Sequence, residues 1–568
     1  MIKEVLLIFK THLDIGFTDL AENVTKKYLN SYIPSAIETA YRQKDTEHPF
    51  IWTTGSWLIN LALKNDDGRV EKAIQDGLIK WHALPFTSHT EYMNPELFRY
   101  CLDISRKLDD RFGKKTIAAK MSDVPGHTIG IVPMMADAGI ELLHIGVNPA
   151  TPVPNVPEVF TWKFGDKSIN VMYNGGGYGS VFEFDDFAVS FCVTGDNLGA
   201  QNDDELKALY TEMHEKYPEA VVRAATLDDI AIKLRGKRLP VIESEIGDNW
   251  IHGVGTDPTK TTAFRALLRS GKRLSDHDLD ENLMLVPEHT WGMDQKAHFD
   301  NDKDFLRADF EKAENKETFE SSWKEQRDYV YRAADIMGVD LSSELAVKTP
   351  DIGGMEICDD KPLMRVFYQL FDAEDYRRYK RDYLQIDEEW ADWDFLKVGL
   401  PEYEGGIFEA NVVRALKNGE KKIFELKFED EITEFCGLPK VWLIEEDGKT
   451  EIRWFGKKNN RLPEAFWAKF EGYNENFELL KMGQWILPEN CLGMKNLHCV
   501  FSARNDEIEI ENLDAPLAAP FGPHMLEWNN PTEKQDLHFN LYNNIWNTNF
   551  PMWFSDDAKF RFILKKHR

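Results

Sequence analysis

A histidine and an aspartate follow the first apolar run of the chain, with one residue between them. In MIKEVLLIFKTHLDIGFTD, the apolar run 5–9 gives way almost at once to His12 and Asp14. Imidazole and carboxylate are ligands of divalent metal ions, and they are also the groups of general acid and base catalysis. A polar loop after a strand contains such residues for solvation alone, so the pair by itself leaves both interpretations open.

Comparable polar residues follow several later apolar runs. They occur in HALPFTSHTE, MSDVPGHT, VTGDN and GDNWIHGVGTDP, as His82, His89, Glu91, Asp123, His127, Asp196, Asp248, Trp250 and His252. The carboxyl ends of parallel strands meet at one edge of a sheet, where the chemistry of such folds is concentrated. The repetition therefore favours a site over a chance polar loop.

A mixed nitrogen and oxygen site is the simplest chemistry for these residues. His12, Asp14, Asp123 and one further histidine would suit Zn²⁺, and Mn²⁺ or Co²⁺ is also compatible. No cysteine lies in these segments, which argues against a closed structural zinc site.

The elements that must position these residues come from an alternation of short apolar and amphipathic segments. The apolar runs are 5–9, 50–53, 79–83, 117–120, 142–145, 169–173, 191–193, 221–225 and 241–245, and the clearest amphipathic segments are 19–42, 95–112 and 203–216. Such alternation predicts a mostly parallel sheet, open or closed into a barrel. The pattern turns helical from about residue 257 and becomes β-rich beyond about residue 353.

Composition restricts the partners. Of 568 residues, 42% are hydrophobic and 12% aromatic, which is typical of a packed globular protein. The formal charge of −29 argues against nucleic acid and anionic membranes as partners. Six cysteines without CxxC spacing fit reduced thiols, and no signal peptide or membrane span is recognisable, so we expect a cytoplasmic protein. A homo-oligomer is left open.

Two of these segments also carry a family resemblance. THLDIGFTD, followed about a hundred residues later by MSDVPGHT, resembles the catalytic domain of the family 38 glycoside hydrolases, the retaining α-mannosidases. GDNWIHGVGTDPTKTTAFR, PEHTWGMD and LYNNIWNTNFPMW resemble further stretches of that family, in the same order. We therefore expect a multidomain α/β + α + β chain, with an N-terminal (β/α)7-type barrel over 1–256, a helical bundle over 257–345 and a C-terminal β-sandwich over 346–568.

The resemblance implies a metal site and a nucleophile. Its zinc ligands transfer to His12, Asp14, Asp123 and His289, and Asp123 is also the implied nucleophile. The chain departs from the family after His289, where Thr290 stands in place of an aspartate. His252 is the alternative ligand if His289 is not one.

The acid/base residue and the substrate contacts are less strongly marked. The family's acid/base segment has its nearest match in TGDNLGA, which points to Asp196. The substrate-binding candidates are Trp57, His89, Glu91, Trp250, His252 and Asn544. For His89 a structural role is the stronger alternative, and each tryptophan serves equally well as core.

The implied function is two-step retaining hydrolysis of α-mannoside-like linkages in an oligosaccharide or glycoside. Asp123 would attack the anomeric carbon, and a second carboxyl would protonate the leaving oxygen. A metal-dependent carbohydrate deacetylase or amidohydrolase remains an alternative, because a metal-bound water uses similar ligands. A non-catalytic carbohydrate-binding relative is a third.

Overall fold

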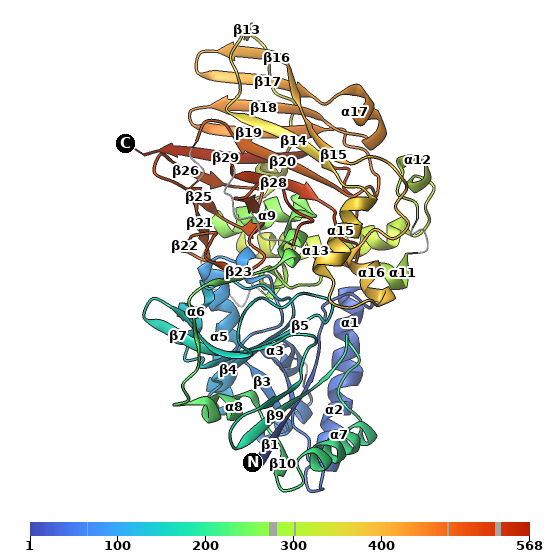
Figure 1. Cartoon of the computed structure of the whole chain (residues 1–568), viewed down its shortest axis with the longest axis vertical. Helices are drawn as coiled ribbons and strands as arrows, with labels where there is room; N and C mark the ends of the chain where they lie inside the picture. The colour runs from blue at the N-terminus through green and yellow to red at the C-terminus, as the bar shows by residue number, and fades with distance from the viewer. Residues whose placement is uncertain (65, 272–280, 300–302, 474–475, 529–535, 568) are drawn as a thin grey trace. The chain divides into compact units, whose positions relative to one another are not determined.

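The computed structural model describes residues 1–64, 66–271, 281–299, 303–473, 476–528 and 536–567 (Figure 1). The chain forms two compact units. Unit 1 comprises Met1–Thr90, Pro95–Glu245 and Glu288–Thr290, and unit 2 comprises Glu91–Asn94, Ile246–Pro287 and Trp291–Arg568. The predicted helical segment is thus grouped with the β-rich region, and the three predicted domain limits remain predictions.

The first sheet of unit 1 is built around the strand that precedes His12. Its order is β3-β2-β1-β9-β8, with β10 also paired to β1, and its members are β1 (Glu4–Thr11), β2 (Trp52–Gly55), β3 (Ile79–His82), β8 (Val181–Glu183), β9 (Phe187–Thr194) and β10 (Val221–Ala224). β1 runs parallel to β2, β9 and β10. This central position explains its unbroken apolar run, because both faces are buried.

The second sheet of unit 1 has the order β11-β6-β7-β5-β4. Its members are β4 (Ala118–Asp123), β5 (Leu142–Val147), β6 (Val159–Phe164), β7 (Lys167–Asn174) and β11 (Val241–Ile242). β4, β5 and β7 are parallel, and β6 forms an antiparallel hairpin with β7. Every predicted strand of this region overlaps an observed one, but β6 and β8 were not predicted.

Helices connect the strands of unit 1. They are α1 (Ala21–Lys27), the π-helical turn η1 (Tyr28–Tyr32), α2 (Ile33–Gln43), α3 (Ser56–Lys64), α4 (Arg69–Gln75), the 3-10 turn η2 (Thr90–Tyr92, which runs into unit 2), α5 (Pro95–Phe112), α6 (Ile131–Asp137), α7 (Asp203–Lys216) and α8 (Leu227–Leu234). The starts of α7 and α8 are fixed by capping boxes, in which Asn202 and Thr226 accept hydrogen bonds from backbone N–H groups. The predicted segments 95–112 and 203–216 coincide with α5 and α7.

Unit 2 begins with helices and continues with antiparallel strands. Its helices are η3 (Asn249–Gly255), α9 (Pro258–Arg269), α10 (Glu281–Leu285), α11 (Gln295–His298), α12 (Arg307–Phe310), α13 (Lys316–Met337), α14 (Ser342–Leu345), α15 (Ala373–Tyr383), α16 (Glu389–Phe395) and α17 (Asp430–Cys436). Buried Arg265 of α9 donates hydrogen bonds to the carbonyl oxygens of Val500, Asn512 and Leu513. Such contacts explain why the helices and the β-rich region form one compact unit.

Two large sheets make up the rest of unit 2. One has the order β13-β16-β17-β18-β19-β29-β26-β25-β21-β22 and the other β15-β14-β20-β28-β27-β24. Their strands are β13 (Glu356–Ile357), β14 (Met364–Leu370), β15 (Gly406–Glu409), β16 (Asn411–Asn418), β17 (Lys421–Lys427), β18 (Lys440–Glu446), β19 (Lys449–Phe455), β20 (Glu464–Phe470), β21 (Glu478–Lys481), β22 (Gln484–Ile486), β24 (His498–Cys499), β25 (Ser502–Arg504), β26 (Ile508–Asn512), β27 (Leu517–Ala519), β28 (His538–Asn543) and β29 (Ala558–Lys566). β12 (Glu245–Gly247) and β23 (Cys491–Gly493) form a separate pair.

Both large sheets contribute to one hydrophobic core in unit 2. Val366 and Phe466 come from the six-stranded sheet, and Leu443, Trp454 and Phe560 come from the ten-stranded sheet. The mixed α/β, helical and β-rich order of the chain is therefore as predicted. The closure of unit 1 into a barrel and a sandwich arrangement in unit 2 stay predictions.

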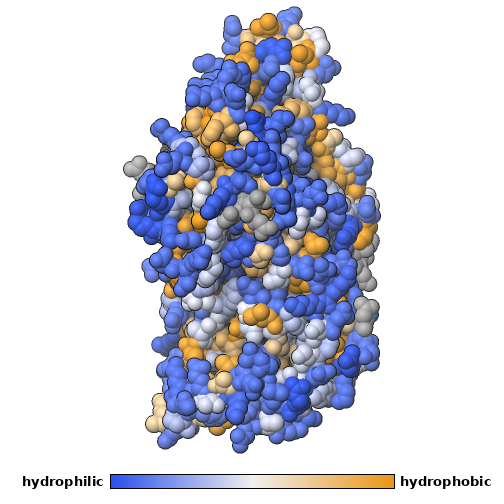
Figure 2. All heavy atoms as spheres, turned by 90° about the vertical axis from the view of Figure 1, so that its right-hand side faces the viewer, coloured by the Kyte–Doolittle hydropathy of each residue, from blue (hydrophilic) through white to orange (hydrophobic). Residues whose placement is uncertain are grey.

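One face of the molecule is predominantly hydrophilic. Figure 2 shows hydrophilic residues over most of one face, with scattered apolar groups between them, in keeping with 97 acidic and 68 basic residues. Within the ranges that the structure describes, no helix is both long enough and apolar enough to cross a membrane.

Candidate active site

The candidate site lies within unit 1, where polar residues follow three strands. His12 and Asp14 come after β1, Asp123 is the last residue of β4, and Asp196 follows β9. His289 belongs to the short segment Glu288–Thr290, which is far along the chain but part of unit 1. Its backbone N–H donates to the carbonyl oxygen of Thr87, which attaches the segment to the loop after β3.

His12, Asp14 and His289 form a tight buried group. The Nε2 atoms of His12 and His289 lie 3.2 and 3.1 Å from the same oxygen, Oδ1 of Asp14. One ligand atom from each of the three residues falls within 4.8 Å of the others. Both Nε2 atoms and Oδ2 of Asp14 are buried without a hydrogen-bond partner. Three buried ligand atoms that converge in this way are compatible with a cation site.

The orientation of His12 is set by its other ring nitrogen. Nδ1 lies 2.9 Å from Oγ of Ser122, the residue before Asp123 in β4. Ser122 is held in turn, because its N–H donates to Oγ1 of Thr87. Engagement of Nδ1 leaves Nε2 as the nitrogen that faces Asp14, as expected for an imidazole that binds a metal through Nε2.

His289 is oriented by its neighbour in the sequence. Oε1 of Glu288 lies 2.6 Å from Nδ1 of His289, and both side chains are buried. The backbone N–H and the hydroxyl of Thr290 donate to the same carboxylate. Thr290, which departs from the family pattern, therefore fixes Glu288 rather than replacing a ligand. His289 is thereby the histidine that joins His12 and Asp14.

Asp123 adopts an uncommon backbone conformation. Its φ is +79°, in the left-handed region, which costs a non-glycine residue of order 1–3 kcal/mol. Asn148, just after β5, holds it twice, because the backbone N–H donates to the Asp123 carbonyl and Nδ2 donates to Oδ1 of its carboxylate. The other oxygen, Oδ2, lies 3.7 Å from Nε2 of His289.

One hydroxyl connects the two carboxyls that the sequence singles out. The Tyr178 hydroxyl lies 3.0 Å from Oδ1 of Asp123 and 2.9 Å from Oδ1 of Asp196. The Tyr178 ring packs on the His12 ring, with centroids 4.3 Å apart. Burial and then the charges of Asp123 and Asp196 raise the pKa of Tyr178 well above its usual value, so the phenol keeps its proton.

The loops after β1 and β9 are tied together by a residue that sequence reasoning missed. Asn197 Oδ1 accepts from the N–H of Asp14, while Nδ2 donates to the carbonyl oxygens of Asp14 and Gly16. Its φ of +53° is one that asparagine tolerates better than most residues. Its position directly after Asp196 was the only available signal.

The carboxylates and imidazoles of this buried group shift one another's pKa values. Burial alone would raise the pKa of Asp14, but the imidazoles of His12 and His289 hold it well below its usual value. Burial likewise opposes protonation of both histidines, yet Asp14 raises the pKa of His12, and Glu288 together with Asp14 raises that of His289. Among the described residues, no lysine or arginine forms an ion pair with these carboxylates.

Asp196 differs from the other carboxyls of the site. Its side chain is 39% exposed. Partial burial and the negative charge of Asp14 raise its pKa to about 6, an effect that His12 only partly offsets. A carboxyl whose pKa is raised toward neutral pH and that remains accessible has the properties of a general acid.

Two further candidates lie in unit 1 in apolar or enclosed surroundings. Trp57 is 4% exposed and packs edge-on against Phe86, with ring centroids 5.7 Å apart. His89 is also buried. Both placements agree with the structural alternatives that the sequence left open.

The remaining candidates lie in unit 2. Glu91 accepts hydrogen bonds from the ammonium group of Lys481 and the N–H of Cys499. Trp250 and His252 pack against the ring of Trp546, and the polar atoms of Asn544 are hydrogen-bonded to backbone groups. Each of these side chains is buried and makes the contacts named above.

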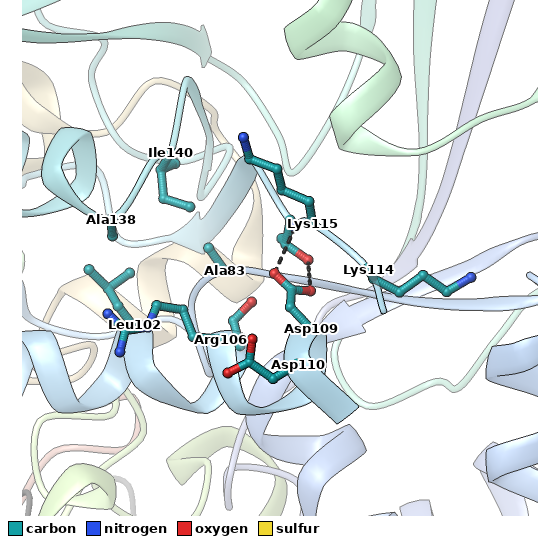
Figure 3. Close-up of a pocket in the computed structure, with 11 residues that line it drawn as sticks. Ala83, Leu102, Arg106, Asp109, Asp110, Lys114, Lys115, Ala138 and Ile140 are labelled. Atoms are coloured by element: carbon teal, nitrogen blue, oxygen red, sulfur yellow. Dashed lines mark hydrogen bonds between the residues drawn. The ribbon is translucent and has the colours of Figure 1, made fainter. Parts of the chain in front are cut away.

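A separate cavity in unit 1 carries no comparable chemistry. It has a volume of about 210 Å³ and is lined partly by α5 and by the residues before β4 and β5 (Figure 3). Its carboxylate Asp109 accepts hydrogen bonds from the N–H and the hydroxyl of Thr116 and from the indole of Trp81. Asp109 therefore has a structural role, anchoring the start of β4.

The chain is similar to known proteins in one part of its sequence and in its fold. A family described as a domain of unknown function (DUF5054) matches residues 254–351. No curated protein sequence matches the chain. Solved structures do: an α-mannosidase from Enterococcus faecalis V583 superposes with a TM-score of 0.61 and 9% identity, over 100% of this chain and 87% of the other.

A second solved structure also has a similar fold. It is a protein in glycosyl hydrolase family 38 from Enterococcus faecalis, with a TM-score of 0.52 and 9% identity, over 100% of this chain and 86% of the other. At such low identity the likeness concerns the fold. Over its whole length the chain has a fold similar to that of these two proteins.

Proposed function

We propose that this protein is a metal-dependent retaining glycoside hydrolase that acts on α-mannoside-like linkages. The observation that carries the proposal is the Tyr178 hydroxyl, which joins Asp123 to Asp196 beside the His12, Asp14 and His289 group. The two bonded oxygens lie no more than about 6 Å apart, the sum of the two contacts, which favours the short carboxyl separation of retaining enzymes.

One hydrogen-bond donor serves both carboxyls. The Tyr178 hydroxyl carries a single hydrogen and lies within hydrogen-bonding distance of Oδ1 of Asp123 and of Asp196, so it donates to one of them at a time. Asp123 also accepts a hydrogen bond from the side-chain amide of Asn148. We assign Asp196, whose pKa is raised to about 6, as the acid; its Oδ1 accepts a hydrogen bond from the Tyr178 hydroxyl.

The roles of Asp123 as nucleophile and Asp196 as acid suit the first chemical step. The carboxylate of Asp123 forms a bond to the anomeric carbon while the bond to the leaving oxygen breaks, and Asp196 gives its proton to that oxygen. In the second step Asp196 takes a proton from water, which attacks the same carbon and releases Asp123. The Tyr178 hydroxyl, which contacts both carboxyls, would keep their relative positions fixed through both steps.

The ligand set supports a divalent metal ion as the cofactor. The unpaired buried atoms of His12, Asp14 and His289, with Asp123 beside them, suit a single divalent ion such as Zn²⁺. When bound, such an ion supplies positive charge for the hydroxyl oxygens of a sugar. The chain's own residues would hold and orient it, with Ser122 and Glu288 fixing the two imidazoles.

Metal analysis combined with a panel of aryl glycosides, α-mannosides first, tests the proposal. We expect about one equivalent of divalent metal, activity that chelators abolish, and a first-formed product with the anomeric configuration of the substrate. Asp123→Asn should lower kcat at least about 10³-fold. Asp110→Asn, at an exposed residue of α5, is the matched control and should retain activity.

Three results would contradict the proposal. Wild-type protein without bound metal and insensitive to chelators would remove its central element. Amidase or deacetylase activity that survives Asp123→Asn would favour a metal-bound water as nucleophile. No turnover of any glycoside would favour a carbohydrate-binding protein.

A further inference from the structure

Unit 1 contains a buried lysine on the strand that ends at Asp123. Lys120 of β4 is 1% exposed, three residues before Asp123. Its Nζ lies 2.8 Å from the backbone carbonyl oxygen of Tyr178 and 2.8 Å from Nδ1 of His144. Among the described residues, no carboxylate pairs with this amine. Burying a lysine without a counter-charge is costly, so its two hydrogen bonds need an explanation.

One acceptor of Lys120, the imidazole of His144, is itself held in place by packing. The imidazole of His144 stacks on Phe191, with ring centroids 3.7 Å apart. Burial holds the pKa of His144 well below its usual value, so Nδ1 of the neutral ring can accept a hydrogen bond. Burial also lowers the pKa of Lys120 well below its usual value, and the amine has at least two hydrogens for these two acceptors whether or not it is charged.

The backbone around Tyr178 needs such an anchor. Tyr178 lies in the segment GGGYGS between β7 and β8, where Gly176 and Gly177 have φ of +78° and +154°. Glycine-rich backbone is permissive and does not by itself hold one conformation. The tyrosine carbonyl also packs closely on Gly146 of β5, where an added Cβ would lie 2.2 Å from that oxygen.

We propose that Lys120 is a positioning residue that holds the Tyr178 backbone, so that the tyrosine hydroxyl bridges Asp123 and Asp196. The inference rests on the proposed function for its catalytic consequence, but the geometry it describes is independent of the substrate. A series of contacts within unit 1 ends at the Tyr178 carbonyl. Phe191 stacks on His144, and the amine of Lys120 is hydrogen-bonded to His144 and to that carbonyl. A small displacement of groups that flank a reacting bond costs much of the rate.

Lys120→Met tests the inference, because methionine preserves length and burial but removes the donor. We expect kcat to fall about 10- to 100-fold, with KM changed less than about threefold and metal content unchanged. Lys397→Met is the matched control. Lys397 is a buried lysine of unit 2 that also donates to one backbone carbonyl and one side chain. It should lose stability without a comparable fall in kcat.

A double-mutant cycle with Tyr178→Phe identifies the route of the effect. If Lys120 acts through the tyrosine, adding Lys120→Met to Tyr178→Phe lowers kcat no further. Independent, multiplicative losses would overturn the inference, as would a Lys120→Met enzyme as active as the Lys397→Met control. Should Lys120→Met fail to fold, Lys120→Gln and Gly146→Ala disturb the same carbonyl and carry the same expectation.

A crystal structure of Lys120→Met, or of Lys120→Gln, gives a readout that needs no substrate. We expect the Tyr178 hydroxyl to lose hydrogen-bonding distance to at least one of the two carboxyls. A hydroxyl that still bridges Asp123 and Asp196 would overturn the positioning role even if the enzyme were active. Wild-type protein without glycosidase activity would instead contradict the proposed function and leave the structural result to decide this inference.

Discussion

Glu288 and His289 are consecutive residues, and a carboxylate oxygen of the first lies 2.6 Å from Nδ1 of the second. The contact fixes the imidazole so that Nε2 faces Asp14. A carboxylate behind a metal-binding histidine makes the ring a better ligand and restricts its orientation. The same contact explains why the pKa of His289 is raised despite burial.

Glu288→Gln should therefore weaken metal binding without removing a ligand. Glutamine keeps the length and an acceptor oxygen but loses the negative charge, and we expect the metal affinity to fall about 10- to 100-fold. Competition with a metal-sensitive fluorescent chelator measures the change. Glu219→Gln, at an exposed position of unit 1, provides the control. An unchanged affinity for Glu288→Gln would show that Glu288 does not support the ligand.

Replacing either histidine by alanine distinguishes the two ligand alternatives. His289 and His252 are both buried, so each substitution creates a cavity of similar size. We expect His289→Ala to lose stoichiometric metal and His252→Ala to retain it, because Nε2 of His289 lies 3.1 Å from Oδ1 of Asp14, whereas Nδ1 of His252 lies 3.0 Å from Oδ1 of Asn543. Elemental analysis of the purified proteins gives the answer. Metal loss in His252→Ala with retention in His289→Ala would reverse the assignment.

Local patterns predicted the parts of the site that lie at strand ends. His12, Asp14 and Asp123 were recognisable because an apolar run ends and polar residues begin at the same edge of a sheet. β6 was missed because its burial alternates only weakly along VFTWKF, although its hairpin partner β7 was found. The exposed side of a short strand carries little hydrophobic signal.

The supporting residues could not be predicted, because their contacts join distant parts of the chain. Tyr178 is 55 positions from Asp123, and Asn197 is 183 positions from Asp14. Neither residue type is unusual where it occurs, in a glycine-rich loop and in a turn. Their roles depend on how the strands are brought together, which hydrophobic periodicity does not specify.

Asp196→Asn should separate the acid function from metal binding. The amide cannot donate a proton to the leaving oxygen, so kcat/KM for a methyl or sugar leaving group should fall about 10²- to 10⁴-fold. A dinitrophenyl glycoside, whose leaving group needs no protonation, should be affected far less. Metal content should not change. Asp185→Asn, at a position whose side chain is 96% exposed, serves as the control. Equal losses on both substrates would exclude Asp196 as the acid.

Asp248, a buried carboxyl of unit 2, should make the stability of the fold depend on pH. One of its oxygens accepts hydrogen bonds from the N–H of Trp250 and the hydroxyl of Tyr383, while the other has no partner. Burial raises its pKa to about 7, against an unfolded value near 4. Its proton is therefore held more tightly in the folded chain, so the stabilisation is complete below about pH 4 and is lost as pH rises toward 7.

Asp248→Asn keeps the accepting oxygen and removes the titration. Relative to wild type, the free energy of unfolding of the variant should rise by as much as about 1.4 kcal/mol per pH unit between pH 4 and 7. Above that range, the difference between the two proteins should be constant. Denaturant unfolding of both proteins at several pH values measures the difference, in which groups common to both cancel. Asp166→Asn, at an exposed turn, should run parallel to wild type. A difference between Asp248→Asn and wild type that does not vary with pH would mean that Asp248 is ionised in the folded protein, and that its second oxygen has a partner of opposite charge.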